Sequence, residues 1–540
     1  MIFMRQTLTL VLVTCLAISL HAQNTPDSYR NPILPGYHPD PSICRVGGDY
    51  YLVNSTFEWY PGLPVYHSKD LVNWDLIGYG IDRPLQVEFP EGMGDSRGVF
   101  APTIRFHDGI YYIINTCVAC NGNFYITATN PAGPWSDPVW LHSPGIDPSL
   151  FWDDDGRCYY VGHANISGVN DWTDKHGAWM QELDLVQKKL VGERKQLTHG
   201  HASNARWTEG PHLYKIDGVY MLLVAEGGTG FHHSITFHNS DSLWGPYIPN
   251  QTNPVLSHRH LGKDYPIHSV GHADLVETQN GDWWSVMLAK RQVDGYTLLA
   301  RETFMTPVEF ETQETGQLTP VYNRGIGNLL LEQKRPDLPW SPVDPIPVRD
   351  EFENDPLALY WNFLRTPYHK WYELGEGKIQ IQLRPQVLDN LVNPSMIARR
   401  IEHHAFRAAT KLVFNPKKEN EQAGLVIYRR SKNHYQLLKQ KEGLVLIKTL
   451  KGEKQEIARI PFEHSEVVLF AEAKGLDIQF SYGSSLEDLK PIGPIQNMNV
   501  ISDELAGGFN GPYVGMYATS NGSKSKTNAG FEWFEYEESN

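Results

Sequence analysis

The chain has 540 residues, of which 41% are hydrophobic and 20% charged, and its formal net charge is −15 at pH 7. It is too long for one ordinary hydrophobic core, so we expect at least two domains, and its composition is that of a folded protein. The negative charge argues against nucleic acid or an anionic membrane surface as the main partner. We expect a neutral or weakly charged substrate. Aromatic residues make up 12% of the chain, which suits either strand cores or rings that stack on sugars.

The N-terminus has the pattern of a signal peptide. Arg5 precedes an apolar run from Leu8 to Leu20, and Ala22 follows where signal peptidase would cut. This run is too short to cross a membrane, and no later segment approaches about 18 uninterrupted apolar residues. We therefore predict cleavage after residue 22, no membrane span, and a secreted or periplasmic protein. A lipoprotein signal at Cys15 is the less favoured alternative, because a threonine precedes that cysteine.

Four cysteines remain after residue 22. Cys117 and Cys120 form a CxxC pair that could close a tight disulfide outside the cytoplasm, although the sequence leaves their redox state open. A second ligand pair with the spacing of a zinc site is missing from the sequence. Cys44 and Cys158 lie in apolar segments, where buried free thiols are the default.

An internal repeat dominates the first 330 residues. Each repeat has an apolar run, a glycine-containing turn and an aromatic run, which is the signal of a β-hairpin. The turn glycines are 48, 109, 156, 218 and 281. One hairpin per repeat of this length is typical of a four-stranded propeller blade, so we predict an all-β fold with a five-bladed β-propeller over residues 28–330.

The segments before these turns place five residues at nearly the same point of successive repeats. These residues are Asp40, Ala101, Asp147, Glu209 and His272. If each belongs to the innermost strand of its blade, their side chains converge on the central axis. Glu209 is separated from the following proline by one extra residue, which a β-bulge could absorb.

Three of these five residues are carboxylates, and gathering like charges raises the pKa of each. Glycoside hydrolysis uses such a cluster, because one acid must protonate the leaving oxygen while a carboxylate activates water or attacks the sugar. A third carboxylate can keep the acid protonated. The alternative for Asp40 and Asp147 is an ordinary Asp-Pro turn, for Glu209 a strand-end surface residue, and for His272 a buried structural histidine.

Several motifs in this order resemble the glycoside hydrolases of family 43. The motifs are NPIL at 31–34, HPDPS at 38–42, IDPSLF at 146–151, TEGPH at 208–212, and RETF at 301–304 with TPV at 306–308. The RETF and TPV segments together resemble the segment that closes the propeller in the β-xylosidase and arabinofuranosidase branch. The resemblance covers essentially the whole mature chain.

The resemblance implies a role for each matching residue. Asp40 would be the general base, Glu209 the general acid and Asp147 the residue that tunes and orients the acid. Members of the family invert the anomeric configuration, which requires the acid and base to lie roughly 6.5–9.5 Å apart. Arg301 would hydrogen-bond the terminal sugar and Phe57 would pack against it.

The resemblance also bears on metals. His272 resembles a histidine on the propeller axis that lies beside a metal ion or water in family members, so structural calcium near His272 is one expectation. We expect no cofactor to be required for the reaction.

One departure from the family pattern bears on the sugar. Where relatives that act on β-xylosides often carry Trp-Ala-Pro-His, this chain has Phe100-Ala101-Pro102-Thr103. We place Phe100 at the substrate, and the change favours an α-L-arabinofuranosidase. The resemblance implies exo action that releases a terminal pentose from oligosaccharides of hemicellulose such as arabinoxylan or xyloglucan. A β-D-xylosidase is the alternative, a retaining propeller enzyme is a third, and a non-catalytic sugar-binding propeller is the alternative of another class.

The sequence changes character beyond residue 330. Five prolines between 336 and 347 indicate a stiff linker over 331–347. Strict alternation at 378–383 and 477–482 predicts strands with one buried face, so we expect a C-terminal β-sandwich over 348–540. This region resembles the jelly-roll domain of the same enzyme branch, in which a loop reaches the propeller. Phe509 is the candidate for that contact, with ordinary core packing as its alternative. The sequence does not indicate the oligomeric state.

Overall fold

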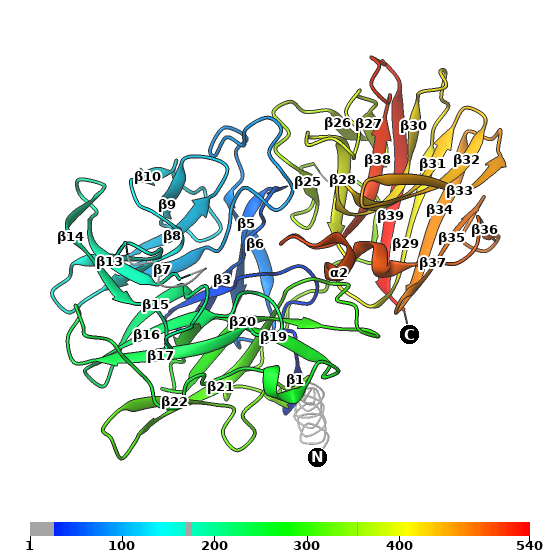
Figure 1. The fold of residues 1–540 in the computed structure, drawn as a ribbon. Helices are drawn as coiled ribbons and strands as arrows, with labels where there is room; N and C mark the ends of the chain where they lie inside the picture. The colour runs from blue at the N-terminus through cyan, green and yellow to red at the C-terminus, as the bar shows by residue number, and fades with distance from the viewer. Residues whose placement is uncertain (1–25, 169–174, 354, 540) are drawn as a thin grey trace, which may run out of the picture.

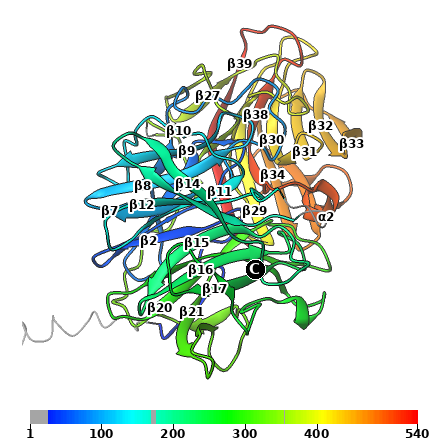
Figure 2. The same ribbon diagram turned by 60° about the vertical axis from the view of Figure 1, so that its left-hand side comes forward.

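The computed structural model describes residues 26–168, 175–353 and 355–539, which form two all-β bodies in contact (Figures 1 and 2). The predicted signal peptide lies outside the described residues. Within those ranges, no helix combines the length and the apolar character that a membrane crossing needs.

The first body is the predicted five-bladed propeller. Each blade is one antiparallel sheet of four strands that follow one another along the chain. The first three blades are β2 (Ser42–Val46), β3 (Asp49–Val53), β5 (Gly62–Ser68), β6 (Asp75–Ile81); β7 (Thr103–His107), β8 (Ile110–Cys117), β9 (Gly122–Ala128), β10 (Val139–Leu141); and β11 (Ile146–Trp152), β12 (Cys158–His163), β13 (Ala178–Asp184), β14 (Lys189–Thr198). The last two are β15 (Glu209–Ile216), β16 (Val219–Glu226), β17 (Ser234–Ser240), β18 (Ile248–Pro249); and β19 (Ile267–Glu277), β20 (Trp283–Arg291), β21 (Glu302–Thr312), β22 (Leu318–Tyr322).

The five predicted hairpins join the first two strands of each blade. Gly109, Gly156, Gly218 and Gly281 adopt the positive φ expected of them, and in the first blade the left-handed residue is Gly47 rather than Gly48. The adjacent pair Asp108 and Gly109 has φ values of 47° and 78°, which a two-residue turn of this kind requires.

The ends of the propeller are tied to each other. Strand β1 (Ser28–Arg30) pairs with β23 (Glu332–Lys334), and the Asn31 side chain exchanges hydrogen bonds with the Met305 backbone. The first residues of the predicted 331–347 linker are therefore part of this closure. The domain bounds themselves stay predictions.

The second body is a β-sandwich, as predicted. One sheet contains nine strands: β26 (Tyr372–Gly375), β27 (Lys378–Gln382), β39 (Asn528–Glu538), β29 (Ala405–Val413), β34 (Glu466–Lys474), β35 (Asp477–Gly483) and β36 (Lys490–Pro491), with β24 (Arg349–Asp350) and β37 (Gln496–Asn497) attached. The other contains β33 (Glu453–Pro461), β32 (Gly443–Leu450), β31 (Asn433–Gln440), β30 (Gln422–Arg430), β38 (Tyr513–Thr519), β28 (Ser395–Arg400), β25 (Asn362–Leu364) and β4 (Trp59–Tyr60). Short helices are η1 (Arg259–Leu261), η2 (Met498–Ile501) and α2 (Asp503–Ala506). Alternating residues of β27 and β35, such as Ile379 and Phe480, are buried in the core as the sequence predicted.

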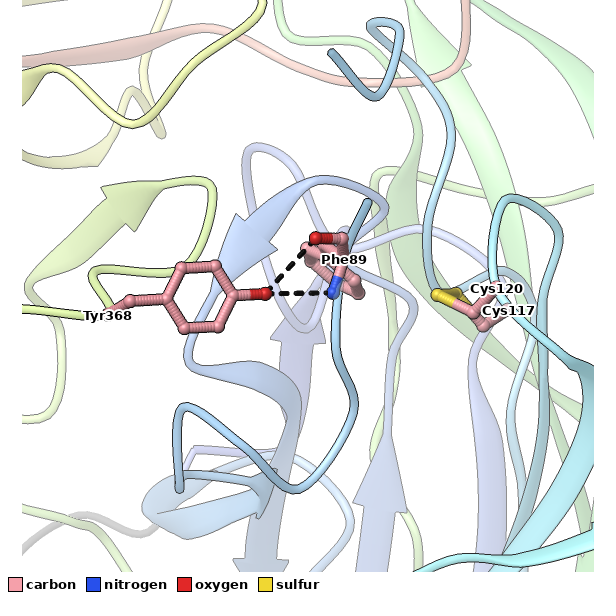
Figure 3. Close-up of a disulfide and its surroundings, with 4 residues drawn as sticks. All are labelled: Phe89, Cys117, Cys120 and Tyr368. Carbon is pink, nitrogen blue, oxygen red and sulfur yellow. Dashed lines mark hydrogen bonds between the residues drawn. A yellow bond between two sulfur atoms is a disulfide. The ribbon is translucent and has the colours of Figure 1, made fainter. Parts of the chain in front are cut away.

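The two bodies share a sheet. Strand β4 comes from the first blade yet pairs with β25 of the sandwich, and Trp59 stacks on Tyr513 with the ring centroids 3.5 Å apart. Figure 3 shows another contact, in which the Tyr368 hydroxyl hydrogen-bonds the backbone N–H and carbonyl of Phe89. Strand pairing and side-chain contacts therefore join the sandwich to the edge of the propeller's first blade.

The cysteines are arranged as the sequence suggested. Cys117 and Cys120 form a disulfide at the end of β8, as drawn in Figure 3, while Cys44 and Cys158 are buried free thiols.

A buried ion pair also crosses the interface. Arg365, which follows β25, donates to Asp95 of the propeller at 2.9 Å, and both side chains are almost fully buried. Ser431 donates to the same carboxylate through its backbone and hydroxyl.

We predict that Arg365→Met lowers the free energy of unfolding by about 3–5 kcal/mol, because the buried Asp95 carboxylate loses its nearest guanidinium at 2.9 Å and retains only that of Arg430 at 3.8 Å. Urea denaturation followed by fluorescence measures this. The control is Arg407→Met, which removes a half-exposed partner of Glu472 and should cost less than about 1 kcal/mol. Equal losses in both variants would contradict the assignment.

Candidate active site

A pocket of about 490 Å³ opens at the axis of the propeller, beside the sandwich. All eight residues that the sequence singled out line it: Asp40, Phe57, Phe100, Asp147, Glu209, His272, Arg301 and Phe509. Residues from all five blades and from the second domain therefore meet in one hollow.

The backbone explains why residues of successive repeats point to the same place. Asp40, Asp147 and His272 have φ values of 52°, 50° and 51°, a left-handed conformation that non-glycine residues rarely adopt. In the fourth blade Gly210 takes this conformation, at 56°, and Glu209 precedes it. The pairing of β15 with β16 shifts register between Glu209 and His212, so the predicted irregularity is present. Strained backbone of this kind persists where the surrounding fold enforces it.

Asp40 is held by two donors. Arg301 donates to Oδ1 at 2.5 Å and the Ser55 hydroxyl donates to Oδ2 at 2.6 Å, while the carboxylate is 3% exposed. Asp40 and Arg301 thus form a buried, charge-assisted ion pair.

Glu209 and Asp147 lie in a different electrostatic environment. Burial, followed by the negative charges of Asp147 and Asp40, holds the pKa of Glu209 well above its ordinary value, and Arg301 opposes this. Burial raises the pKa of Asp147 to about 6, although His272 opposes the rise. The pocket thus contains one carboxylate in an ion pair and two carboxyl groups whose pKa values are raised.

Arg301 joins the two domains at the site. Its second terminal nitrogen donates to the Phe509 backbone carbonyl at 2.8 Å, and its guanidinium lies 5.2 Å from the centre of the Phe57 ring. Phe57 in turn packs on Phe100, with the centroids 4.8 Å apart, and on Phe509 at 5.8 Å. Phe509 is 42% exposed, so it is a pocket residue and the alternative of ordinary core packing is wrong.

The loop that carries Phe509 is anchored to the propeller by Glu58. The Asn510 side chain donates to one oxygen of Glu58 at 2.6 Å, and the Ser96 backbone donates to the other at 3.0 Å. The Ser96 hydroxyl then accepts from the Phe509 backbone at 2.8 Å. Burial and the nearby Asp95 raise the pKa of Glu58 to about 7, so this anchor titrates near neutrality.

His272 lies at the axis against Gly210, where a Cβ atom would come within 3.1 Å of the imidazole. The charge of His272 lowers the pKa of four groups around it, which are Asp147, His163, His212 and His233. Calcium prefers six to eight oxygen ligands, and among these groups only Asp147 supplies carboxylate oxygens. No cluster of three or more His, Cys, Asp or Glu side chains arranged to hold a metal is found among the described residues. Calcium near His272 stays a prediction.

Several pocket residues were not predicted from the sequence, and three of them carry rings. Trp207, Phe231 and His232 form the wall on the side of the fourth blade. Trp207 stands two residues before Glu209, so its place in the motif was a usable signal; Phe231 and His232 belong to a loop outside the repeat, where position could not be predicted.

Comparison with known proteins identifies relatives over the whole described chain. The family model described as "Glycosyl hydrolases family 43" matches residues 29–315, and that of the "Beta xylosidase C-terminal Concanavalin A-like domain" matches residues 349–537. The chain is 41% identical to a "Xylosidase/arabinosidase" of Butyrivibrio fibrisolvens, over 94% of this chain and 99% of that protein. It is 39% identical to "Non-reducing end alpha-L-arabinofuranosidase BoGH43B" of Bacteroides ovatus, over 94% of each.

Solved structures agree with these matches. "Bacteroides ovatus Xyloglucan PUL GH43B" superposes with a TM-score of 0.87 at 38% identity, covering 95% of this chain and all of that one. A xylan beta-1,4-xylosidase from Bacillus halodurans C-125 superposes with a TM-score of 0.88 at 36% identity, covering 94% and 100%.

Asp147→Asn tests the electrostatics of the carboxyl cluster. We expect the pKa of Glu209 to fall towards its ordinary value, because a negative neighbour is removed. Infrared pH titration measures this, with Glu209→Gln identifying the Glu209 band. Asp154→Asn, on an exposed turn, is the control and should leave the band unchanged. An unaltered Glu209 titration in Asp147→Asn would refute the coupling.

Glu58→Gln tests the anchor. A carboxyl group with a raised pKa in the folded state stabilises the fold below its unfolded pKa, near 4.5, and this contribution is lost as the pH rises through about 7. We expect thermal stability of the wild type to decline across this range and the decline to be shallower in Glu58→Gln. Parallel melting-temperature curves for the two proteins would show that Glu58 does not titrate there.

Proposed function

Since this chain belongs to family 43 of the glycosyl hydrolases, it is a glycoside hydrolase, and we propose that it removes single terminal pentoses from hemicellulose oligosaccharides with inversion at the anomeric carbon. The observation that carries the proposal is the contrast in one pocket between Asp40, paired with Arg301, and Glu209, whose pKa is raised. Inversion needs such a pair, a base for water and an acid for the leaving oxygen.

Each residue then has a chemical task. Asp40 accepts a proton from the attacking water, and Glu209 donates its proton to the glycosidic oxygen as the bond breaks. Asp147 adds its negative charge to the burial that raises the pKa of Glu209. Arg301 orients the terminal sugar while holding Asp40, because a planar guanidinium can serve a carboxylate and hydroxyl groups together.

The aromatic wall supports action at a chain end. Phe57 and Phe100 enclose the pocket on the propeller side, and Phe509 of the sandwich encloses it further. A walled pocket suits one terminal sugar better than the middle of a polymer.

We favour α-L-arabinofuranosides over β-D-xylosides. The support is Phe100, which stands where relatives acting on xylosides often carry tryptophan, and the likeness to an arabinofuranosidase at 39% identity. β-D-Xylosidase activity is the second candidate, favoured by the likeness to a "Xylan 1,3-beta-xylosidase" of Vibrio at 35% identity. We also propose export from the cytoplasm, on the strength of the N-terminal apolar run.

Wild-type enzyme with 4-nitrophenyl α-L-arabinofuranoside and β-D-xyloside tests the activity and ranks the two sugars. We expect Asp40→Asn to lower kcat by about 10²–10⁴-fold on all substrates. Glu209→Gln should lose a similar factor on oligosaccharides but less on nitrophenyl glycosides, whose leaving group needs little protonation. Asp154→Asn should match the wild type.

Proton NMR of the first-formed sugar checks the stereochemistry. Inversion is expected, and a retained anomer or wild-type turnover in Asp40→Asn would overturn the assigned roles.

A further inference from the structure

The pocket has a second aromatic wall, which the roles above do not use. The phenylalanine wall consists of Phe57, Phe100 and Phe509, from the first and second blades and the sandwich. The Trp207 wall consists of Trp207, Phe231 and His232, with the glycine-rich segment 227–230. All of the Trp207 wall belongs to the fourth blade and its connections, and in a ring of five the fourth blade neighbours neither the first nor the second.

Trp207 is fixed in place by its neighbours. The Arg206 guanidinium lies 4.4 Å from the centre of the Trp207 ring system. Gly228 lies so close that a Cβ atom there would come within 2.7 Å of the indole Cε3. The backbone of Trp207 is left-handed, with φ of 47°, a strained conformation that clusters at functional sites.

Hydrogen bonds fix the loops of this wall to each other. The Gly227 N–H donates to the Arg206 carbonyl at 2.9 Å. Next to it, the buried Glu226 carboxylate accepts from the His201 backbone at 2.9 Å and pairs with the His201 ring at 2.5 Å. The Trp207 side chain is therefore a partly exposed flat surface on a rigid support, which is the form of a stacking platform rather than of a mobile loop.

The stereochemistry of an inverting displacement indicates that the leaving group binds on the side of the Trp207 wall. Glu209 is two residues from Trp207 and belongs to the same blade, whereas Asp40, Arg301 and Phe57 contact one another and come from the first and fifth blades. In an inverting displacement, the acid meets the leaving oxygen on the face opposite to the water that the base activates. The terminal pentose therefore lies against the phenylalanine wall, and the leaving group attached to it extends towards the Trp207 wall.

We propose that Trp207 is the specificity-determining residue for the leaving group, and that it stacks on the first backbone sugar of the oligosaccharide from which the pentose is released. The inference rests on the proposed function. It implies that the substrate is a pentose attached to another sugar ring with an apolar face, and not a pentose on a small alcohol.

Trp207→Ala with two substrates of the same pentose tests the inference. A glycosyl fluoride of the pentose that the wild type hydrolyses has no sugar in its leaving group, whereas the corresponding pentosyl xylo-oligosaccharide has one. We expect Trp207→Ala to lower kcat/KM about tenfold or more on the oligosaccharide and less than about twofold on the fluoride. Trp207→Phe, which keeps a flat ring, should recover part of the loss.

Two control variants separate a stacking role from general damage. Phe57→Ala removes part of the opposite wall and should lower kcat/KM on both substrates. Trp152→Ala removes a tryptophan that stacks on His107 outside the pocket and should affect neither.

Three outcomes are distinguishable. Selective loss on the oligosaccharide supports the inference. Equal loss on both substrates in Trp207→Ala, or no loss on either, overturns it while the proposed function stands. Failure of the wild type on both substrates overturns the proposed function itself.

Discussion

The site depends on gathering three carboxyl groups around one guanidinium. Arg301 pairs with Asp40, while burial and neighbouring negative charges raise the pKa of Glu209 and of Asp147. Such a cluster is unfavourable for folding, because like charges repel and burial penalises each of them. The left-handed backbone at Asp40 and Asp147 adds to this cost. The rest of the propeller must supply the stability that keeps these groups together.

A buried hydrogen-bond network at the axis supplies part of this stability. Asp274 of β19 accepts hydrogen bonds from Ser42 of β2 at 2.6 Å, Arg105 of β7 at 2.8 Å and Tyr214 of β15 at 2.5 Å. Its carboxylate thus ties together the inner strands of four blades, and its partners hold its pKa far below the ordinary range. The sandwich supplies the other support, because Phe509 and Asn510 reach Arg301 and Glu58 from a second core.

The sequence predicted most of the fold, because its signals were local and repeated. Hairpin glycines and alternating runs each report on a few neighbouring residues, and the disulfide joins residues three apart. The pairing of β4 with β25 could not be predicted, since two residues carry no strand signal and their partner lies about 300 positions away. The pocket residues of the repeat could be predicted because they occupy equivalent positions in successive blades. Phe231 and His232 could not be predicted, because they lie outside the repeat.

The break in the repeat at Glu209 has a chemical consequence. In two blades the aspartate itself takes the left-handed position, but in the fourth blade Gly210 takes it and the carboxyl group moves one residue upstream. The acid is also one methylene longer than the aspartates. Its position relative to the blade therefore differs from theirs, although the strands are equivalent. A strictly repeated aspartate would give the pocket three similar carboxyl groups, whereas inversion requires an acid and a base that differ in position and in protonation.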